Sequence, residues 1–429
     1  MQIKLAYGKQ GLPLSLPDDA NVTVLEPAFV PGLPDEAAAL REALRAPLNG
    51  APLHERVGAG DTVAIVFSDI TRPTPNHLLI PALLAELDHV PPEQIVLVNA
   101  LGTHRPNTDD ELRRMLGDAV VDRCRIEQSD AFDASTQVHL GTTSFGHELW
   151  VNRAYMDADV KILTGFIEPH FFAGFSGGGK SVMPGIAGQA TVLGNHDAGM
   201  IGSPNATWGV TWGNPIWEEA RECALRTEPD FVLNVTLNRD KHITGIFAGD
   251  LDTAHQAGID FVRRTAMVPI REPFDVVITT NSGYPLDLNL YQAVKGMSAA
   301  AQAVRQGGAI VIASECWDGI PDHGLYGQLL HDATSPDHLL ANILSWETPR
   351  QDQWQAQIQA KVQQKARVFV YSDYLSDEQL RGALLEPCRD IAATVEALRA
   401  EYGRDARIAV MPEGPQTVPY RVPEAASAG

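Results

Sequence analysis

Cysteine is scarce in this chain of 429 residues, which contains only four. No two of them form a Cys-x-x-Cys pair, and their wide spacing excludes both a disulfide framework and a cysteine-based zinc site as the basis of the fold. A reducing compartment is the simplest inference. The four residues are Cys124, Cys223, Cys316 and Cys388.

Long apolar runs are also missing. No stretch approaches the roughly 20 apolar residues that a membrane-spanning helix needs. The opening segment, MQIKLAYGKQGLPL, has neither the apolar core nor the small-residue cleavage site of a signal peptide. We therefore expect a cytoplasmic protein that does not enter a membrane.

Positive charge is in deficit. The chain has 33 Lys and Arg against 54 Asp and Glu, a formal net charge of −21. Nucleic acids and anionic membrane surfaces bind to basic patches, so we expect neither as a partner. An anionic small-molecule substrate stays compatible with this charge, because a local cluster of Arg and Lys can override the global field.

The remaining composition is that of a globular enzyme, with 44% apolar and 20% charged residues. The chain is longer than one hydrophobic core usually spans, and predicted strands alternate with predicted helices. Two prolines near residues 266–273 interrupt this rhythm, which restarts with an apolar strand. We predict an α/β protein of two Rossmann-like domains, residues 1–270 and 271–429, with an active-site cleft between them.

Polar side chains follow two apolar strands of the first predicted domain. The strand at 63–67 leads into a loop with Asp69 and Arg72, and the strand at 95–99 leads into a loop with His104. Ligands of open α/β sheets bind at the carboxyl ends of the strands, so these side chains are candidates for a site. Each has an ordinary alternative: a turn residue, a surface ion pair and a structural histidine, respectively.

A third predicted strand, 159–164, leads into the glycine-rich stretch Gly165–Met200. This stretch holds His170, Lys180 and His196. Glycine lets a backbone approach a ligand closely, and histidine and lysine supply groups that titrate, bind metal or act as a nucleophile. We expect the three strand ends to converge on one crevice.

One segment of this stretch, GFSGGGKS at Gly174–Ser181, matches the P-loop pattern GxxxxGK[ST]. A phosphotransferase or nucleotide hydrolase that uses Lys180 is therefore an alternative function. The context differs from a P-loop, because Gly174 lies eight residues after Phe166 and Pro184 falls where the first helical turns should run. The backbone N–H groups of the loop could still bind a phosphate.

The histidines do not form a local metal motif. The chain has no HExxH, and His104, His170 and His196 are too dispersed for a zinc motif in sequence. A metal site assembled from separate strand ends remains open, and so does acid–base work by two histidines on the two faces of a carbon atom.

Five motifs, in this order and combination, closely resemble those of the nickel-dependent lactate racemase family. The resemblance spans essentially the whole chain and both predicted domains. The motifs are SDITRP (68–73), GTHRP (102–106), EPHFFAGFSGGGKSVMPGIAG (168–188), NH (195–196) and YQAVKG (291–296).

The resemblance implies a cofactor, the nickel-pincer nucleotide, in which a pyridinium mononucleotide holds nickel through carbon and two sulfurs. Lys180 matches the lysine that tethers this cofactor, and His196 matches the histidine that supplies the remaining nickel ligand. Other proteins make the cofactor, so cofactor-biosynthesis proteins are expected partners. Further cofactor contacts are expected from Asp69, Arg72, Gly177, Gly178 and Gly179.

The resemblance also implies a reaction, the racemisation or epimerisation of a 2-hydroxy acid by reversible hydride transfer to the cofactor. His104 and His170 match the two acid–base histidines. Gln292 and Lys295 are three residues apart on a predicted helix, hence on one face. The expected substrate-binding residues are Arg72, Tyr291, Gln292 and Lys295, with helix packing or solvation as the alternative for the last three.

These motifs do not predict which side chain the hydroxy acid carries, because they do not identify the pocket residues that would set its size. A protein that binds hydroxy acid or metal without turnover is a further alternative to the isomerase.

Overall fold

Two parallel β-sheets, one in each of two units, organise the chain in the computed structural model, which describes residues 1–322 and 324–422. The N-terminal unit comprises Phe29–His196 and Pro204–Arg264. The C-terminal unit comprises Met1–Ala28, Asp197–Ser203 and the described part of the chain from Thr265 onward.

The sheet of the N-terminal unit has six strands in the order β13-β12-β9-β4-β5-β6. All neighbours pair in parallel except β13, which is antiparallel to β12. The strands are β4 (Val63–Ser68), β5 (Ile95–Ala100), β6 (Arg125–Gln128), β9 (Val160–Phe166), β12 (Phe231–Leu237) and β13 (Ile243–Gly249).

Both faces of this sheet are buried, which explains the continuous apolar runs of its strands. Along β4, Val63, Ile65 and Phe67 belong to one hydrophobic cluster, and Ala64 and Val66 belong to another. The first cluster includes side chains of α1 (Glu36–Arg45), α3 (Asn76–Glu86) and α4 (Asp109–Leu116). The second includes those of α6 (Arg153–Met156), α7 (Gln189–Asn195) and α9 (Pro215–Arg226).

One further helix of this unit is long, α10 (Leu251–Ala266). The remaining elements are short: α2 (Leu53–Arg56), α5 (Asp118–Arg123), the hairpin β7 (Gln137–Thr142) and β8 (Glu148–Asn152), and the small pair β10 (Pro169–His170) and β11 (Gly174–Phe175). The sequence Thr108-x-x-Glu111 has the pattern of a capping box, and the structure has one at the start of α4. The Thr108 hydroxyl accepts from the Glu111 N–H, and the Glu111 carboxylate accepts from the Thr108 N–H.

The C-terminal unit has a second six-stranded sheet, in the order β18-β17-β16-β15-β19-β3, in which all neighbours are parallel. Its strands are β3 (Asn21–Val24), β15 (Phe274–Thr280), β16 (Val304–Ala313), β17 (Ala366–Tyr371), β18 (Glu386–Cys388) and β19 (Arg407–Val410). The small sheets are β1 (Gln2–Leu5) with β2 (Leu12–Ser15), and β14 (Met267–Ile270) with β20 (Val418–Arg421). The helices are α8 (Ala198–Gly202), α11 (Leu290–Ala303), α12 (Tyr326–His331), α13 (Pro336–Leu344), α14 (Gln353–Lys365), α15 (Asp377–Gly382) and α16 (Ile391–Tyr402).

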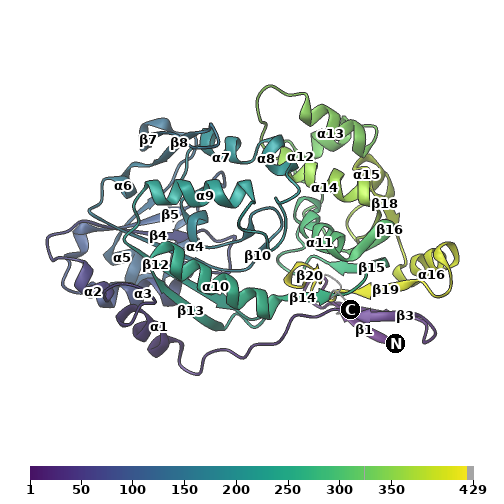
Figure 1. Ribbon diagram of the computed structural model, residues 1–429, viewed down its shortest axis with the longest axis horizontal. Coiled ribbons are helices and arrows are strands. Elements are labelled where there is room, and N and C mark those ends of the chain that lie inside the picture. The colour runs from purple at the N-terminus through teal and green to yellow at the C-terminus, as the bar shows by residue number, and fades with distance from the viewer. Residues whose placement is uncertain (323, 423–429) are drawn as a thin grey trace, which may run out of the picture. The chain divides into compact units, whose positions relative to one another are not determined.

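The α/β class and the two-unit organisation agree with the prediction, but the division of the chain differs from the predicted ranges 1–270 and 271–429. Residues 1–28 lie in the C-terminal unit because β3 pairs with β19, from Asn21 opposite Arg407 to Val24 opposite Val410. Figure 1 shows this strand in purple beside the yellow β19. The order of elements in the sequence could not reveal that this strand pairs with one almost 400 residues further along the chain.

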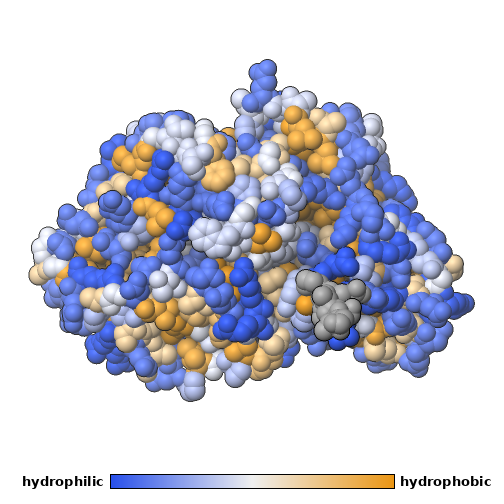
Figure 2. Space-filling view, viewed as in Figure 1, coloured by the Kyte–Doolittle hydropathy of each residue, from blue (hydrophilic) through white to orange (hydrophobic). Residues whose placement is uncertain are grey.

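The surface is mixed in character. On the face shown in Figure 2, hydrophilic side chains cover most of the area, and hydrophobic side chains lie in small separate patches. Within residues 1–322 and 324–422, no helix combines the length and the apolar character needed to cross a bilayer.

Helix α14 is polar in sequence and yet buried. Gln353, Gln355, Gln357 and Gln359 are each at most 2% exposed. Each of these amides makes at least one hydrogen bond. Gln359, for example, donates to the Ala383 carbonyl at 2.8 Å and accepts from the Tyr326 hydroxyl. Burial of these amides is tolerated because hydrogen bonds replace the lost water.

The substitution Gln359→Leu should lower the free energy of unfolding by about 2–4 kcal/mol, because it leaves a buried hydroxyl and a buried carbonyl without partners. Urea denaturation measures this change. Gln364→Leu is the matched control on the same helix, since Gln364 is exposed and its side-chain amide donates to the exposed Asp337 carboxylate. We expect the control to change stability by less than about 0.5 kcal/mol. Equal losses in the two variants would contradict the assignment of a structural role to the buried amide.

Candidate active site

The strands that precede the candidate residues are neighbours in the N-terminal sheet. Strands β9, β4 and β5 lie side by side and run parallel, so their carboxyl ends share one edge. Asp69 follows β4 directly, and His104 follows β5 by four residues. The sheet order therefore supports the predicted convergence of these three strand ends, and a hydrogen bond joins the first two loops.

This hydrogen bond links Asp69 Oδ2 to His104 Nδ1 at 2.7 Å. The Asp69 side chain is 4% exposed, whereas that of His104 is 47% exposed. A carboxylate can only accept, so Nδ1 carries the proton and the neutral ring keeps a lone pair at Nε2. The arrangement makes Nε2 of His104 a proton acceptor held in one tautomer, the role that an Asp–His pair plays in acid–base catalysis.

Asp69 stays ionised at this position. Burial alone would raise the pKa of Asp69, but the hydrogen bond and charge of His104, the charge of Arg72 and the Thr71 hydroxyl together hold the pKa below its ordinary value. The Thr71 hydroxyl donates to Asp69 Oδ1 at 2.8 Å. The backbone carbonyl of Asp69 also accepts from the Arg72 N–H, so the residue forms a turn in addition to its bond with His104.

Phe172 brings three further candidates together. Its buried ring packs edge-to-face against His170, with centroids 4.6 Å apart, and against His196, with centroids 5.1 Å apart. The Lys180 Nζ lies 5.8 Å from the centroid of the same ring. Sequence reasoning did not single out Phe172, although its position in the run HFFAGF next to His170 was a usable signal.

His196 follows α7 directly and is buried. Its Nδ1–H donates to the Val192 carbonyl at 3.0 Å, so in the neutral ring the lone pair is on Nε2. Burial, with the nearby charge of Lys180, lowers the pKa of His196 to about 3. The ring is therefore neutral at physiological pH, as a metal ligand must be.

His170 accepts a hydrogen bond at Nδ1, whereas His104 donates one from the same atom. Its Nδ1 accepts from the Ala173 N–H at 3.2 Å, so in the neutral ring the proton is on Nε2. In this arrangement His104 presents an acceptor at Nε2 and His170 presents a donor. The two histidines are therefore not chemically equivalent.

The glycine loop is buried from Phe171 to Gly179, and Lys180 is the first partly exposed side chain after it. Gly177 and Gly178 have φ values of 76° and 53°, a region that favours glycine. A Cβ atom on Gly177 would lie 2.4 Å from Asn234 Oδ1, and one on Gly178 would lie 2.3 Å from His255 Nδ1. The glycines thus let the loop pack closely against β12 and α10.

Asn234 and His255 hold this loop, and sequence reasoning missed both. The Gly178 N–H donates to Asn234 Oδ1 at 2.9 Å, and His255 Nε2 donates to the Ser176 carbonyl at 2.9 Å. A polar residue inside the apolar strand FVLNVTL was a signal for Asn234, whereas nothing in the sequence marked His255. A Cβ atom on Gly179 would meet the Ala220 carbonyl at 2.7 Å, so this glycine packs against α9.

The geometry contradicts the P-loop alternative. Residues Gly178–Ser181 form one 3-10 turn, and the next α-helix begins only at Gln189. A P-loop lysine opens a long helix, which supplies the phosphate site with its N-terminal N–H groups. Lys180 has no such helix behind it.

The remaining candidates lie on α11 of the C-terminal unit. Gln292 and Lys295 are both partly exposed, and Asn289 caps the helix by accepting from the Gln292 N–H at 3.1 Å. The Tyr291 hydroxyl accepts from the Trp354 indole N–H at 3.2 Å, and its ring packs against Tyr326. Tyr291 therefore has a packing role on this helix.

Comparison with known proteins identifies the family. Residues 7–209 match the family described as "Lactate racemase N-terminal domain", and residues 270–418 match "Lactate racemase C-terminal domain". The chain belongs to the lactate racemase family. The predictions of this family and of an isomerase are thereby confirmed.

Two curated relatives, both named lactate racemase, match along nearly their full length. The protein from Lactiplantibacillus plantarum is 36% identical over 419 residues, which are 96% of this chain and 98% of the relative. The protein from Thermoanaerobacterium thermosaccharolyticum is 34% identical over 418 residues, which are 96% and 97% of the two chains.

Solved structures confirm the fold of this family member. The lactate racemase apoprotein from T. thermosaccharolyticum superposes with a TM-score of 0.91 at 32% identity and covers 98% of this chain and 100% of its own. A protein from Thermotoga maritima superposes with a TM-score of 0.70 at 18% identity over 92% of this chain and 100% of its own, which shows a shared fold.

His255 should make the stability of the protein depend on pH. Burial lowers the pKa of His255 to about 4, so the folded state keeps this ring neutral while the unfolded chain takes up a proton below about pH 6.5. Between these values the unfolded state binds more protons, and the free energy of unfolding falls as the pH falls, by up to about 3 kcal/mol. The variant His255→Gln keeps an N–H donor but does not titrate.

Urea denaturation of both proteins from about pH 7.5 to about pH 4.5 isolates this contribution. We expect the stability advantage of the wild-type protein over His255→Gln to shrink as the pH is lowered through this window. An advantage that stays constant across the window would show that His255 does not remain neutral in the folded state.

Proposed function

We propose that this enzyme racemises lactate or a closely related 2-hydroxy acid, with His104 and His170 as its acid–base pair. The names of the two curated relatives support the substrate class, since both match over at least 97% of their own length. The observation that carries the acid–base assignment is the hydrogen bond from Nδ1 of His104 to the buried Asp69 carboxylate, which leaves Nε2 of His104 as a proton acceptor.

We further propose that the nickel-pincer nucleotide is the cofactor, which when bound takes a hydride from C2 of the substrate and returns it. The donor set fits this group. Lys180 offers a partly exposed primary amine for the tether, and His196 offers one neutral imidazole. Among the described residues, no cluster of three or more His, Cys, Asp or Glu side chains could hold a metal, so the cofactor itself would bring the other nickel ligands.

In the proposed mechanism, Nε2 of His104 takes the hydroxyl proton of one enantiomer as the hydride leaves C2. Asp69 stabilises the imidazolium that forms, through the bond to Nδ1. The product of this half-reaction is a 2-keto acid. Arg72 is proposed to bind the substrate carboxylate, because its guanidinium supplies local positive charge in an acidic protein. Gln292 and Lys295 stay predicted substrate contacts.

For the opposite enantiomer, the oxygen of the reoriented keto acid would take its proton from His170. His104 would then release its proton to solvent and His170 would take one up before the next turnover. His170 must hold two ring protons to give one and remain neutral. The 3.2 Å contact of its Nδ1 with the Ala173 N–H is incompatible with that form. We therefore expect the His170 ring to leave Ala173 during turnover, whereas His104 keeps its partner.

The substitution Asp69→Asn should lower kcat by a factor on the order of 10² to 10⁴, because the amide no longer holds the His104 tautomer or stabilises its imidazolium. The equilibrium constant of a racemisation is 1, so kcat/KM must fall equally in the two directions, and both are measured. Thr71→Val is the matched control: it removes a hydrogen bond to Asp69 and leaves His104 bound. Turnover of Asp69→Asn close to that of the wild-type protein would remove the Asp69–His104 pair from the mechanism.

Protein from a host that makes the cofactor should contain nickel, show an increased intact mass, and racemise one or more members of a hydroxy-acid panel. Lys180→Arg should abolish the mass increase, and His196→Ala should reduce bound nickel, because the tether and the metal ligand are lost. An unmodified mass, no nickel and no racemisation of any hydroxy acid would refute the proposal. Binding of hydroxy acid without turnover by nickel-loaded protein would instead favour the non-catalytic alternative.

A further inference from the structure

We infer that Glu219 is a positioning residue for His196 and acts through Asn195. The inference rests on the proposed function in one respect, the role of His196 as a nickel ligand. Glu219 is a buried carboxylate that lies outside the five family motifs, and in this inference it fixes the orientation of His196.

Glu219 is the centre of a buried polar cluster. It lies on α9 and is fully buried. Its carboxylate accepts from the Thr143 hydroxyl at 2.6 Å, from His147 Nδ1 at 2.9 and 3.1 Å, and from Asn195 Nδ2 at 3.0 Å. Burial of a carboxylate is costly unless the group is paired in this way, so these hydrogen bonds are what make a buried Glu219 tolerable.

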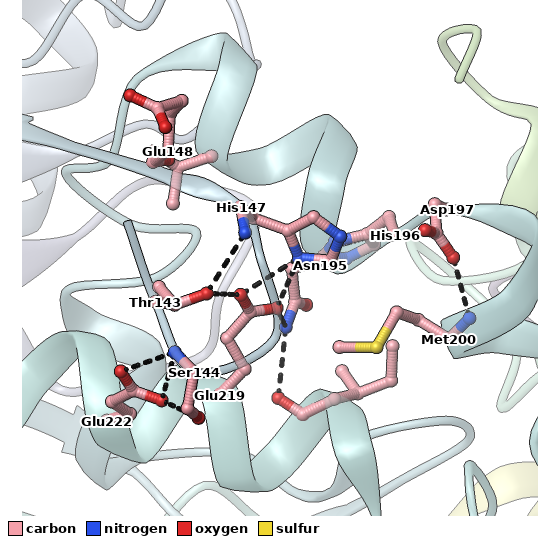
Figure 3. Close-up of polar contacts among 12 residues, drawn as sticks. Thr143, Ser144, His147, Glu148, Asn195, His196, Asp197, Met200, Glu219 and Glu222 are labelled. Carbon is pink, nitrogen blue, oxygen red and sulfur yellow. Dashed lines mark hydrogen bonds and ion pairs between the residues drawn. The ribbon is translucent and has the colours of Figure 1, made fainter. Parts of the chain in front are cut away.

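The cluster ends at the metal-ligand candidate. Asn195 is the last residue of α7 and directly precedes His196. Its Nδ2 also donates to the Ile216 carbonyl of α9 at 3.2 Å, so α9 holds this side chain at two points. Figure 3 shows the Asn195 amide directed at the Glu219 carboxylate, with the His147 ring close by.

Gly194, the residue before Asn195, also packs against this cluster. A Cβ atom on Gly194 would lie 2.6 Å from the His147 ring, so the backbone there packs directly on the imidazole that Glu219 binds. Glu219 thus acts on two successive residues ahead of His196. The His196 ring in turn bonds to Val192, one turn back on the same helix, so a tilt of α7 would move the ring with it.

Helix α7 is only seven residues long, and short helices depend on tertiary contacts for their orientation. Removal of a group that orients a metal ligand typically changes metal affinity or activity 10–100-fold, and Glu219 would orient His196 through Asn195. The structure therefore assigns Glu219 to metal retention.

The chain offers a matched control, Glu222, one turn further along α9. Its carboxylate accepts from the Ser144 N–H at 2.9 Å and from the Ser144 hydroxyl. Glu222 therefore binds the same turn between β7 and β8 as Glu219 does, and its ion pair is with Arg226 on its own helix, α9. The comparison separates loss of the hairpin contact from loss of the α7 contact.

In cofactor-loaded enzyme, Glu219→Gln should release nickel to a chelator about 10–100-fold faster than the wild-type protein. The visible absorption bands of the bound nickel should shift as well, which a change of fold stability alone would not cause. Asn195→Ala should act in the same direction while Glu219 keeps Thr143 and His147. This second variant also serves if Glu219→Gln does not fold. Glu222→Gln should leave both readouts within about twofold of the wild type.

A measurement on cofactor-free protein keeps the inference distinct from the proposed function. Amide hydrogen exchange at residues 192–196 should be faster in Glu219→Gln and Asn195→Ala than in the wild type, and unchanged in Glu222→Gln. If wild-type protein never binds nickel, the proposed function fails while this exchange test still decides the positioning role. Wild-type exchange in both Glu219→Gln and Asn195→Ala, or an equal effect of Glu222→Gln, would overturn the inference.

Discussion

The parallel pairing of β9, β4 and β5 is the constraint on which the candidate site depends. Hydrophobic clusters bury both faces of these strands, so polar groups are excluded from most of their length. Chemistry can then occur only at the strand ends, and parallel direction places all three carboxyl ends at one edge. Asp69 and His104, 35 positions apart in the chain, meet at 2.7 Å for this reason.

A second regularity concerns the histidines. Each of the three candidate rings is anchored through Nδ1, to Asp69, to the Ala173 N–H and to the Val192 carbonyl, respectively. The anchor decides which form the neutral ring has at Nε2: a lone pair in His104 and in His196, whose Nδ1–H donates, and an N–H in His170, whose Nδ1 accepts. The partner at Nδ1 thus sets whether each ring presents an acceptor or a donor. Packing against Phe172 then gathers two of these rings beside Lys180.

The glycine loop matches the sequence pattern of a P-loop but does not have the structure of one. The letters of a P-loop are present at Gly174–Ser181, but only a 3-10 turn forms there. Its glycines are required because Asn234, His255 and Ala220 fill the space that side chains would need. The loop is consequently closely packed and buried, and it ends at a partly exposed lysine.

The sequence by itself determined the α/β class, the strands that carry Asp69 and His104, the capping box of α4 and, through five motifs, the family. These features follow from local periodicity, from capping chemistry and from residues in fixed short spacing, all of which are properties of neighbouring positions. Only the tertiary structure decided that β3 joins the C-terminal sheet and that the amides of α14 are buried. It also decided which side chains contact the candidate residues and the glycine loop, namely Phe172, Glu219, Asn234 and His255. Those outcomes depend on contacts between residues far apart in the chain, and a hydrogen bond such as that from Asn195 to Glu219 has no trace in local sequence because either residue would also suit a solvent-exposed helix.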